Sequence, residues 1–190
     1  QQRFENAEAW QKKKTTEIIY LGEAVSAGLN SIENNVDALQ KNHLPIFANE
    51  TELATAMGVE LKELRFLAFN RKVSTVSHYQ KFYLAKKSGG KRMISAPMPR
   101  LKKAQHWILE NILNKISLHN AVNGFALNRS IVTNAQPHVG KALVLNMDVK
   151  DFFPSIHFKR VKGLLQKLGF SQKIATIIAL ICTEAVTEEV

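Results

Sequence analysis

The sequence of 190 residues has few of the features that mark secreted or membrane proteins. It holds one cysteine, Cys182, so no internal disulfide can form, and a lone thiol in an apolar run favours a buried residue in a reducing cytoplasm. The longest apolar run, 174–182, is interrupted by Thr176 and is far too short to span a bilayer. No secretory leader is visible, although the sequence does not start with Met. We therefore expect a globular cytoplasmic protein that does not enter a membrane, folded as one domain or two small lobes.

Acidic residues are scarce over a long part of the chain. Residues 71–109 contain ten Lys and Arg and no Asp or Glu, and from Leu64 to Met147 the only acid is Glu110. The formal net charge is +10. Protein surfaces normally intersperse both signs, so this one-sided stretch predicts contact with a polyanion, most simply nucleic acid. A solvated basic face with no partner is the alternative.

The hydrophobic pattern predicts mostly helices and one hairpin. Two amphipathic helices near the N-terminus carry no readable chemistry and are interpreted as an accessory extension that packs on the body or meets a partner. Two short helices around Gly58 are compatible with a DNA-reading pair, but the second is acidic at its start and largely apolar, which favours packing. The expected helices are 5–27, 31–44, 50–57, 60–69, 100–118, 158–168 and 171–182.

Segments 79–86 and 92–96 alternate as strands do, and residues 88–90, Ser-Gly-Gly, provide the turn of a hairpin. Four cations surround this turn, and clustered cations beside free backbone N–H groups suit a triphosphate or a nucleic-acid backbone. These cations are Lys86, Lys87, Lys91 and Arg92.

The stretch 143–156 organises the prediction of a catalytic site. Its first half is a run of apolar and β-branched residues that predicts a buried central strand, and Asp148 follows at the strand end. Burying a charged carboxylate at a strand end costs free energy unless the group is paired or binds a metal, and Mg²⁺ prefers oxygen ligands. Pro154 ends the strand, and Ser155 is expected to cap the next helix.

Three blocks in order resemble bacterial reverse transcriptases, and most closely those of retrons. The blocks are KKSGGKRMISAP (86–97), GF…NRSI…NA…H (124–138) and NMDVKDFFPSI (146–156). The resemblance covers roughly residues 45–183. It implies an α+β fold with the fingers and part of the palm of a right-hand polymerase. The expected divisions are 1–45 as a helical extension, 46–140 as fingers, and 141–190 as the first half of the palm.

The resemblance also implies residue roles. Asp148 corresponds to the first catalytic aspartate of the family, and the carbonyl of Val149 helps to hold the same Mg²⁺. Phe153 corresponds to the bulky gate below the sugar. Since alternation sends Phe152 and Phe153 to opposite faces of a strand, one is expected to fill the core and the other to line the cleft.

Further positions are expected to bind substrates. Asp151, Lys91 and Arg92 match residues near the incoming triphosphate. His138 has no partner at ligand spacing, so we interpret it as a hydrogen-bonding residue and not a metal ligand. The expected nucleic-acid contacts are Lys86, Lys87, Arg100, Lys102, Lys103, Asn128, Arg129 and His138.

One departure from the family limits the interpretation. The second metal motif, Tyr-x-Asp-Asp, is absent, and two-metal phosphoryl transfer needs carboxylates for both ions. We therefore interpret the chain as the N-terminal portion of a longer enzyme, inactive alone. The resemblance implies that the whole enzyme uses dNTPs and Mg²⁺ to copy its own structured non-coding RNA into RNA-linked DNA, with an effector protein in phage defence. A nucleic-acid-binding scaffold and a non-retron bacterial reverse transcriptase are the alternatives.

Overall fold

The computed structural model describes residues 8, 10–12, 15–22, 24–69, 77–87 and 89–184. The start of the predicted first helix, the start of the basic stretch at 71–76, Ser88 in the hairpin turn and the acidic tail from 185 onward lie outside the described residues.

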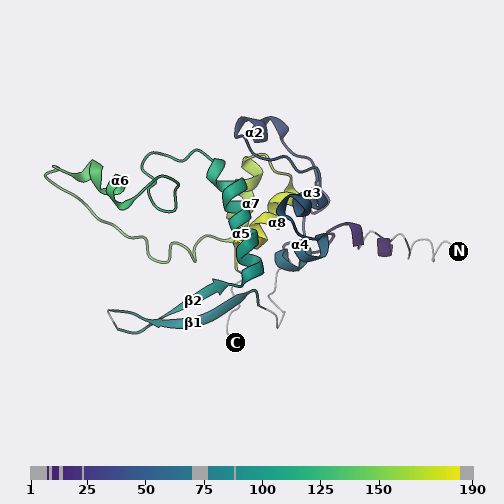
Figure 1. The fold of residues 1–190 in the computed structure, drawn as a ribbon, viewed down its shortest axis with the longest axis horizontal. Coiled ribbons are helices and arrows are strands. Elements are labelled where there is room, and N and C mark those ends of the chain that lie inside the picture. Colours follow the sequence, from purple (N-terminus) through teal and green to yellow (C-terminus); the bar gives the residue numbers. More distant parts are fainter. Residues whose placement is uncertain are drawn as a thin grey trace.

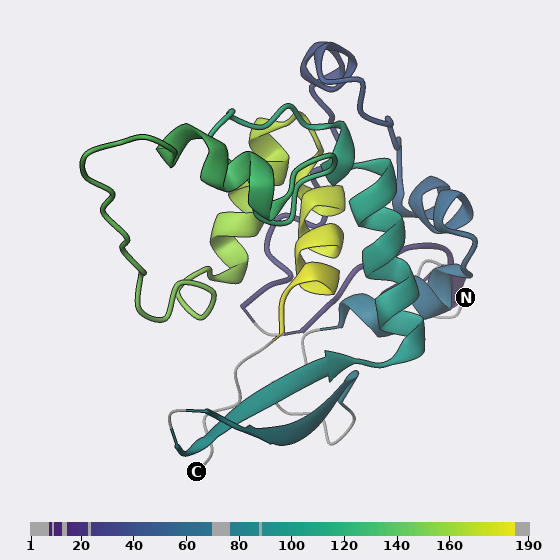
Figure 2. The ribbon, with the colours of Figure 1, turned by 60° about the vertical axis from the view of Figure 1, so that its left-hand side comes forward.

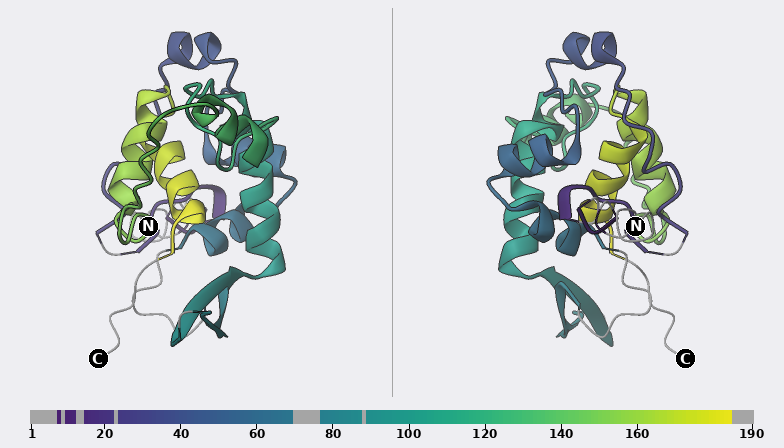
Figure 3. Two further views of the ribbon diagram at one scale, coloured as in Figure 1. Left: turned by 90° about the vertical axis from the view of Figure 1, so that its left-hand side faces the viewer. Right: turned by 90° about the vertical axis from the view of Figure 1, so that its right-hand side faces the viewer.

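Helix α8 (Gln172–Cys182) is the centre of the packing. Eight of its eleven residues are buried, which accounts for its apolar character all round, and the Ser171 hydroxyl accepts the Ile174 N–H at its start as predicted. Helix α7 (Phe158–Lys167) lies on one side of α8 and helix α5 (Pro99–Asn111) on the other (Figures 2 and 3). The core is thus a layer of helices with α8 in the middle.

Helices α3 (Glu50–Met57) and α4 (Leu61–Ala68) pack against the same core and confirm the predicted pair. Gly58 ends α3 with φ +66°, a conformation in which glycine avoids the strain of a side chain. Leu64 and Leu67 of α4 are buried, so this helix packs as predicted.

The N-terminal segment is built into the core. Ile18, Leu21 and Leu29 are buried, although the predicted helix 5–27 is wrong beyond Thr16, because residues 18–21 are not helical. The Ile18 N–H donates to a carboxylate of α3 instead of to a helix carbonyl. Helix α2 (Val36–Lys41) is shorter than predicted and begins after Asn35, whose side chain accepts the Ala38 N–H.

Strands β1 (Tyr79–Ala85) and β2 (Lys91–Pro97) form the predicted antiparallel hairpin, with Phe82 opposite Ile94 in register. The hairpin projects from the helices as an arm (Figure 1). Helix α5 follows β2 directly and buries Leu101, Ala104 and Ile108 as its pattern predicts. It ends at Asn111, and a 3₁₀ helix, η1 (Leu113–Lys115), replaces the predicted continuation to 118.

The chain then leaves the helices in a long excursion, with helix α6 (Ile131–Ala135) and a 3₁₀ turn η2 (Gln136–His138) at its far end (Figures 1 and 2). The predicted buried strand at 143–149 is wrong. Leu143 is 85% exposed and Met147 80%, and no strand of the described part pairs with them. A strand needs a neighbour to satisfy its backbone, and here the apolar run has none.

Helix α7 begins after His157, so the predicted N-cap at Ser155 is also wrong. The Ser155 hydroxyl donates to the Phe152 carbonyl at 2.6 Å and closes a turn before the helix. The secondary structure of the described residues consists of helices and one antiparallel hairpin, which is compatible with the predicted α+β class.

Candidate functional site

The hairpin tip gathers cations as the sequence predicted. Lys86, Lys87, Lys91 and Arg92 are all exposed. The Lys86 N–H donates to the Gly90 carbonyl and the Gly89 N–H to the Lys86 carbonyl, at 3.0 and 3.1 Å. Gly89 and Gly90 have φ of +88° and +81°, which a glycine pair adopts without strain. No ion pair neutralises the four cations in the described part, so the tip presents concentrated positive charge.

The first turn of α5 adds a second basic surface at the base of the hairpin. Arg100, Lys102 and Lys103 are exposed there, and Arg100 lies 4.0 Å from a Glu63 oxygen. Cations at a helix N-terminus oppose the helix dipole, so an external anion would stabilise this end. A shallow pocket of about 540 Å³ opens beside them, lined by Pro97, Pro99, Lys102, Lys103 and His106.

The second sequence block (124–138) forms a loop that is held by hydrogen bonds within the loop itself. The Ser130 hydroxyl accepts the Thr133 N–H and the Thr133 hydroxyl accepts the Ser130 N–H, a capping box that starts α6. The Thr133 hydroxyl lies 2.9 Å from the Asn123 side-chain oxygen, to which it can donate. Arg129 donates to the Asn120 carbonyl at 3.4 Å, and Asn128 has φ +58°. The predicted contacts Asn128, Arg129 and His138 are therefore exposed around a fixed loop.

Two aromatic contacts join the second and third blocks. The Phe153 ring lies 6.1 Å from that of Phe125 and 5.3 Å from that of Phe152, both edge to face. Phe153 is 66% exposed and Phe152 51%, so the expectation that one of them fills the core is wrong in this chain. No sequence pattern predicted the contact of Phe125 with Phe153, because the two residues lie far apart along the chain.

Asp148, Val149 and Asp151 are exposed on the same excursion. Asp151 has φ +52°, and its carbonyl accepts the Ser155 N–H at 3.0 Å. Oxygen donors of this kind suit Mg²⁺. In the ranges that the structure covers, however, no three His, Cys, Asp or Glu side chains form a group that could hold an ion. The donors fit part of a magnesium site and do not complete one, so no catalytic step follows from them alone.

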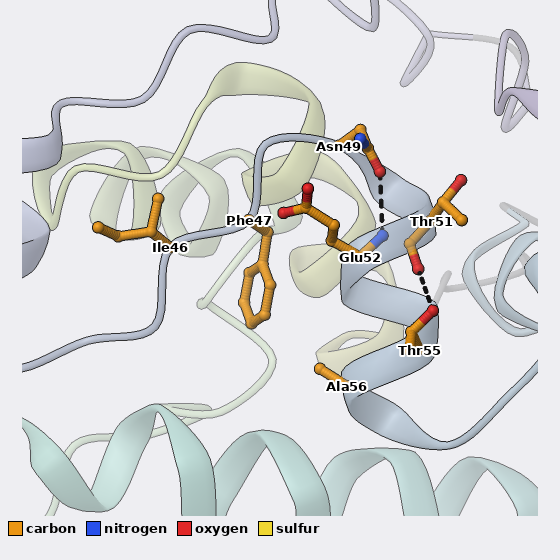
Figure 4. Close-up of a pocket in the computed structure, with 7 residues that line it drawn as sticks. All are labelled: Ile46, Phe47, Asn49, Thr51, Glu52, Thr55 and Ala56. Atoms are coloured by element: carbon orange, nitrogen blue, oxygen red, sulfur yellow. Dashed lines mark hydrogen bonds between the residues drawn. The ribbon is translucent and has the colours of Figure 1, made fainter.

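A second pocket, of about 470 Å³, lies beside α3 and is lined by residues of that helix and of the segment 46–49 before it (Figure 4). Its polar groups bond within the chain: Asn49 accepts the Glu52 N–H at 3.0 Å, and the Thr55 hydroxyl donates to the Thr51 carbonyl. The Glu52 carboxylate accepts the Ala48 N–H. The polar groups of this pocket therefore bond to the start and the backbone of α3 itself.

Comparison with known proteins finds relatives among the reverse transcriptases of retrons. The chain is 39% identical over 189 residues to the retron Mx162 reverse transcriptase of Myxococcus xanthus, a match over 96% of this chain. The chain is homologous to retron reverse transcriptases. It is also 41% identical over 147 residues to the retron Mx65 reverse transcriptase of the same organism, across 77% of this chain. The retron Ec86 reverse transcriptase of Escherichia coli is 34% identical over 150 residues, across 78% of it.

This retron reverse transcriptase homologue spans 38%, 34% and 46% of the lengths of those three relatives, less than half of each. No protein-family model matches it. Within the described ranges, no helix combines the length and apolar character that a membrane crossing requires.

Proposed function

We propose that this chain forms the fingers and the first part of the palm of a retron reverse transcriptase, preceded by a helical extension at residues 1–45. The match to the Mx162 enzyme over nearly the whole chain carries this proposal. The complete enzyme would copy its own structured RNA into RNA-linked DNA from dNTPs, in antiphage defence with an effector protein.

The basic surfaces support the substrate assignments. The hairpin tip, with Lys91 and Arg92, would bind the incoming triphosphate, and α5 with the loop at 128–138 would contact template and product. Concentrated cations favour the negative charge that develops on the transferring phosphoryl group. Bound Mg²⁺ supplies charge stabilisation for that transfer, and Asp148 with the Val149 carbonyl would provide part of its oxygen ligands.

The exposed apolar run 143–149 is consistent with this assignment. Five of its seven residues are apolar and more than half exposed: Leu143, Val144, Leu145, Met147 and Val149. Burying such a run would stabilise a strand by roughly 25 cal/mol for each Å² of apolar surface removed from water. In the complete enzyme the remaining palm strands would supply both the pairing partners and the second carboxylate motif.

The test is primer extension on an RNA template by the complete protein, comparing wild type with Asp148→Asn. We expect Asp148→Asn to abolish DNA synthesis while RNA binding and the melting temperature stay near wild type. Asp37→Asn is the matched control, since Asp37 lies in the first turn of α2 and has no proposed part in catalysis. Wild-type synthesis by Asp148→Asn would contradict the assignment.

A nucleic-acid-binding scaffold is the second candidate, because the described residues do not assemble a metal site. It predicts that the wild-type protein binds RNA with a steep salt dependence but extends no primer. The same experiment therefore distinguishes the two functions.

A further inference from the structure

Helix α7 lies on the opposite side of α8 from α5 (Figures 2 and 3), and one of its faces is basic and exposed. Its inner face is apolar: Leu165 is buried, and Phe158 and Val161 pack against the core. The outer face, which we call the α7 face, consists of Lys159, Arg160, Gly163, Gln166 and Lys167. All five are exposed. Gly163 lies three or four positions from each of the other four, so the five residues share one surface of the helix.

The charge on this face is not neutralised within the described part of the chain. Residues 152–183 contain five Lys and Arg and no acid. Lys173 pairs with Glu50, and Lys162 donates to the Ala27 carbonyl at 3.3 Å. The three cations of the α7 face have no carboxylate within ion-pair distance in the ranges described.

Gly163 in the middle of this face has no explanation from the fold. It lies in a regular helix, and a Cβ built there would have no atom within 4 Å, so neither backbone conformation nor packing requires glycine. Glycine inside a helix costs about 0.5–1 kcal/mol relative to alanine. Its effect is to leave bare helix backbone between Lys159 and Arg160 on one turn and Gln166 and Lys167 on the next.

We propose that the α7 face is a second contact for the phosphodiester backbone of nucleic acid, separate from the hairpin and α5, where Gly163 allows the strand to approach the helix closely. The partner class rests on the proposed function. The face matches a polyanion in charge, and cations in the first turn of α7 oppose the helix dipole until an anion is bound. A lipid surface fits less well, because the apolar side of α7 is already used against the core.

The first experiment measures the affinity of the complete protein for a 20-base-pair RNA duplex by fluorescence anisotropy, over a series of salt concentrations. Lys167→Gln is compared with Lys41→Gln, since both are exposed lysines in the last turn of a helix. We expect Lys167→Gln to reduce the slope of log affinity against log salt by about 0.7–0.9, the value of one phosphate contact, and Lys41→Gln to leave it unchanged. Equal slopes for the two variants would overturn the proposal.

The second experiment uses Gly163→Ala, for which a structural role and a binding role predict opposite results. Alanine favours the helix, so the melting temperature should stay the same or rise. If nucleic acid approaches the bare backbone, RNA affinity should nevertheless fall by about threefold or more, roughly 0.7 kcal/mol. Unchanged affinity would overturn the proposal, as would a polyglutamate peptide that binds as tightly as the duplex.

These outcomes are separate from those of the proposed function. If primer extension depends on Asp148 but the α7 variants bind RNA as wild type does, only the present inference fails. If Asp148→Asn extends primers normally while Lys167→Gln flattens the salt slope, the catalytic assignment fails and the α7 face stands.

Discussion

The ion pair between Glu50 and Lys173 provides a sharp test of how the N-terminal third is held to the core. A Glu50 carboxylate oxygen lies 2.6 Å from the Lys173 ammonium and also accepts the Ile18 N–H at 2.6 Å. The two side chains are 3% and 6% exposed, so both charges have left water almost completely. Removing one partner leaves the other buried and uncompensated, which costs about 3–5 kcal/mol.

We therefore expect Glu50→Gln and Lys173→Met each to lower the free energy of unfolding by about 3–5 kcal/mol, a large share of the 5–15 kcal/mol typical of folded domains. The double variant removes both charges and keeps an acceptor for the Ile18 N–H. Its loss should be well below the sum of the single losses, giving a coupling energy of about 2 kcal/mol or more. Urea denaturation followed by circular dichroism measures all three.

The pair Glu60–Lys62 is the matched control. Its charged atoms are 2.7 Å apart, almost the same distance, but the side chains are 71% and 78% exposed. Exposed pairs contribute little, so Glu60→Gln and Lys62→Met should leave stability unchanged within error. Single losses at Glu50 and Lys173 as small as those of the control, or a double loss equal to their sum, would refute the reasoning.

Three further predictions concern single positions. Gly169 has φ +114°, and a Cβ there would lie 2.6 Å from the Asn35 carbonyl oxygen. Gly58 also has a positive φ, but a Cβ there would meet no atom within 4 Å. Gly169→Ala should therefore lower the melting temperature more than Gly58→Ala does. Cys182 is partly buried, and desolvation by burial raises the pKa of its thiol to about 12, so the native protein should react with thiol reagents at pH 8 more slowly than the unfolded protein does. The folded state holds this proton more tightly than the unfolded state, so stability should fall as the pH rises from about 9 toward 12, and Cys182→Ala should reduce that fall. Phe153→Val in the complete enzyme should raise the use of ribonucleotides relative to dNTPs by about 10-fold or more. Because Phe153 is exposed, the loss of stability should be smaller than the ~3–5 kcal/mol that truncating a buried phenylalanine costs. Unchanged discrimination between the two nucleotide types in a folded enzyme would contradict the role of Phe153 as a sugar gate.

The sequence predicted best those elements whose signals are local. Helix α3 has its glycine cap, α8 has Ser171 and an apolar run interrupted only by Thr176, and the hairpin has a Gly-Gly turn between alternating strands. Each signal lies within a few residues of the element it specifies, so it survives whatever the rest of the chain does.

The errors came from interactions between distant residues. Residues 18–21 were assigned to the helix predicted over 5–27. In the structure, Ile18 and Leu21 are buried in the core, and the Ile18 N–H donates to Glu50 instead of to a helix carbonyl. Segment 143–149 has the composition of a buried strand, yet pairing depends on another segment, and the described part provides none.

The candidate site divides in the same way. The tip cations and their exposure followed from sequence, since a glycine turn fixes where neighbouring side chains lie. The contact of Phe125 with Phe153 did not, because it depends on how two loops meet. Lys173 offered a signal that could have been used, because a single cation in a mostly apolar, buried helix implies a carboxylate partner elsewhere in the chain.

The closure of the core by α8 also sets the timing of folding during synthesis. Glu50 and Lys173 are 123 positions apart, and at about 5–20 residues per second the ribosome needs about 6 to 25 s to travel that distance. Throughout that interval Ile18, Leu21 and Leu39 have been made, but α8, which belongs to the same core, has not. We expect nascent chains arrested before residue 173 to be readily cleaved by protease, and chains long enough to release α8 from the ribosome to become resistant.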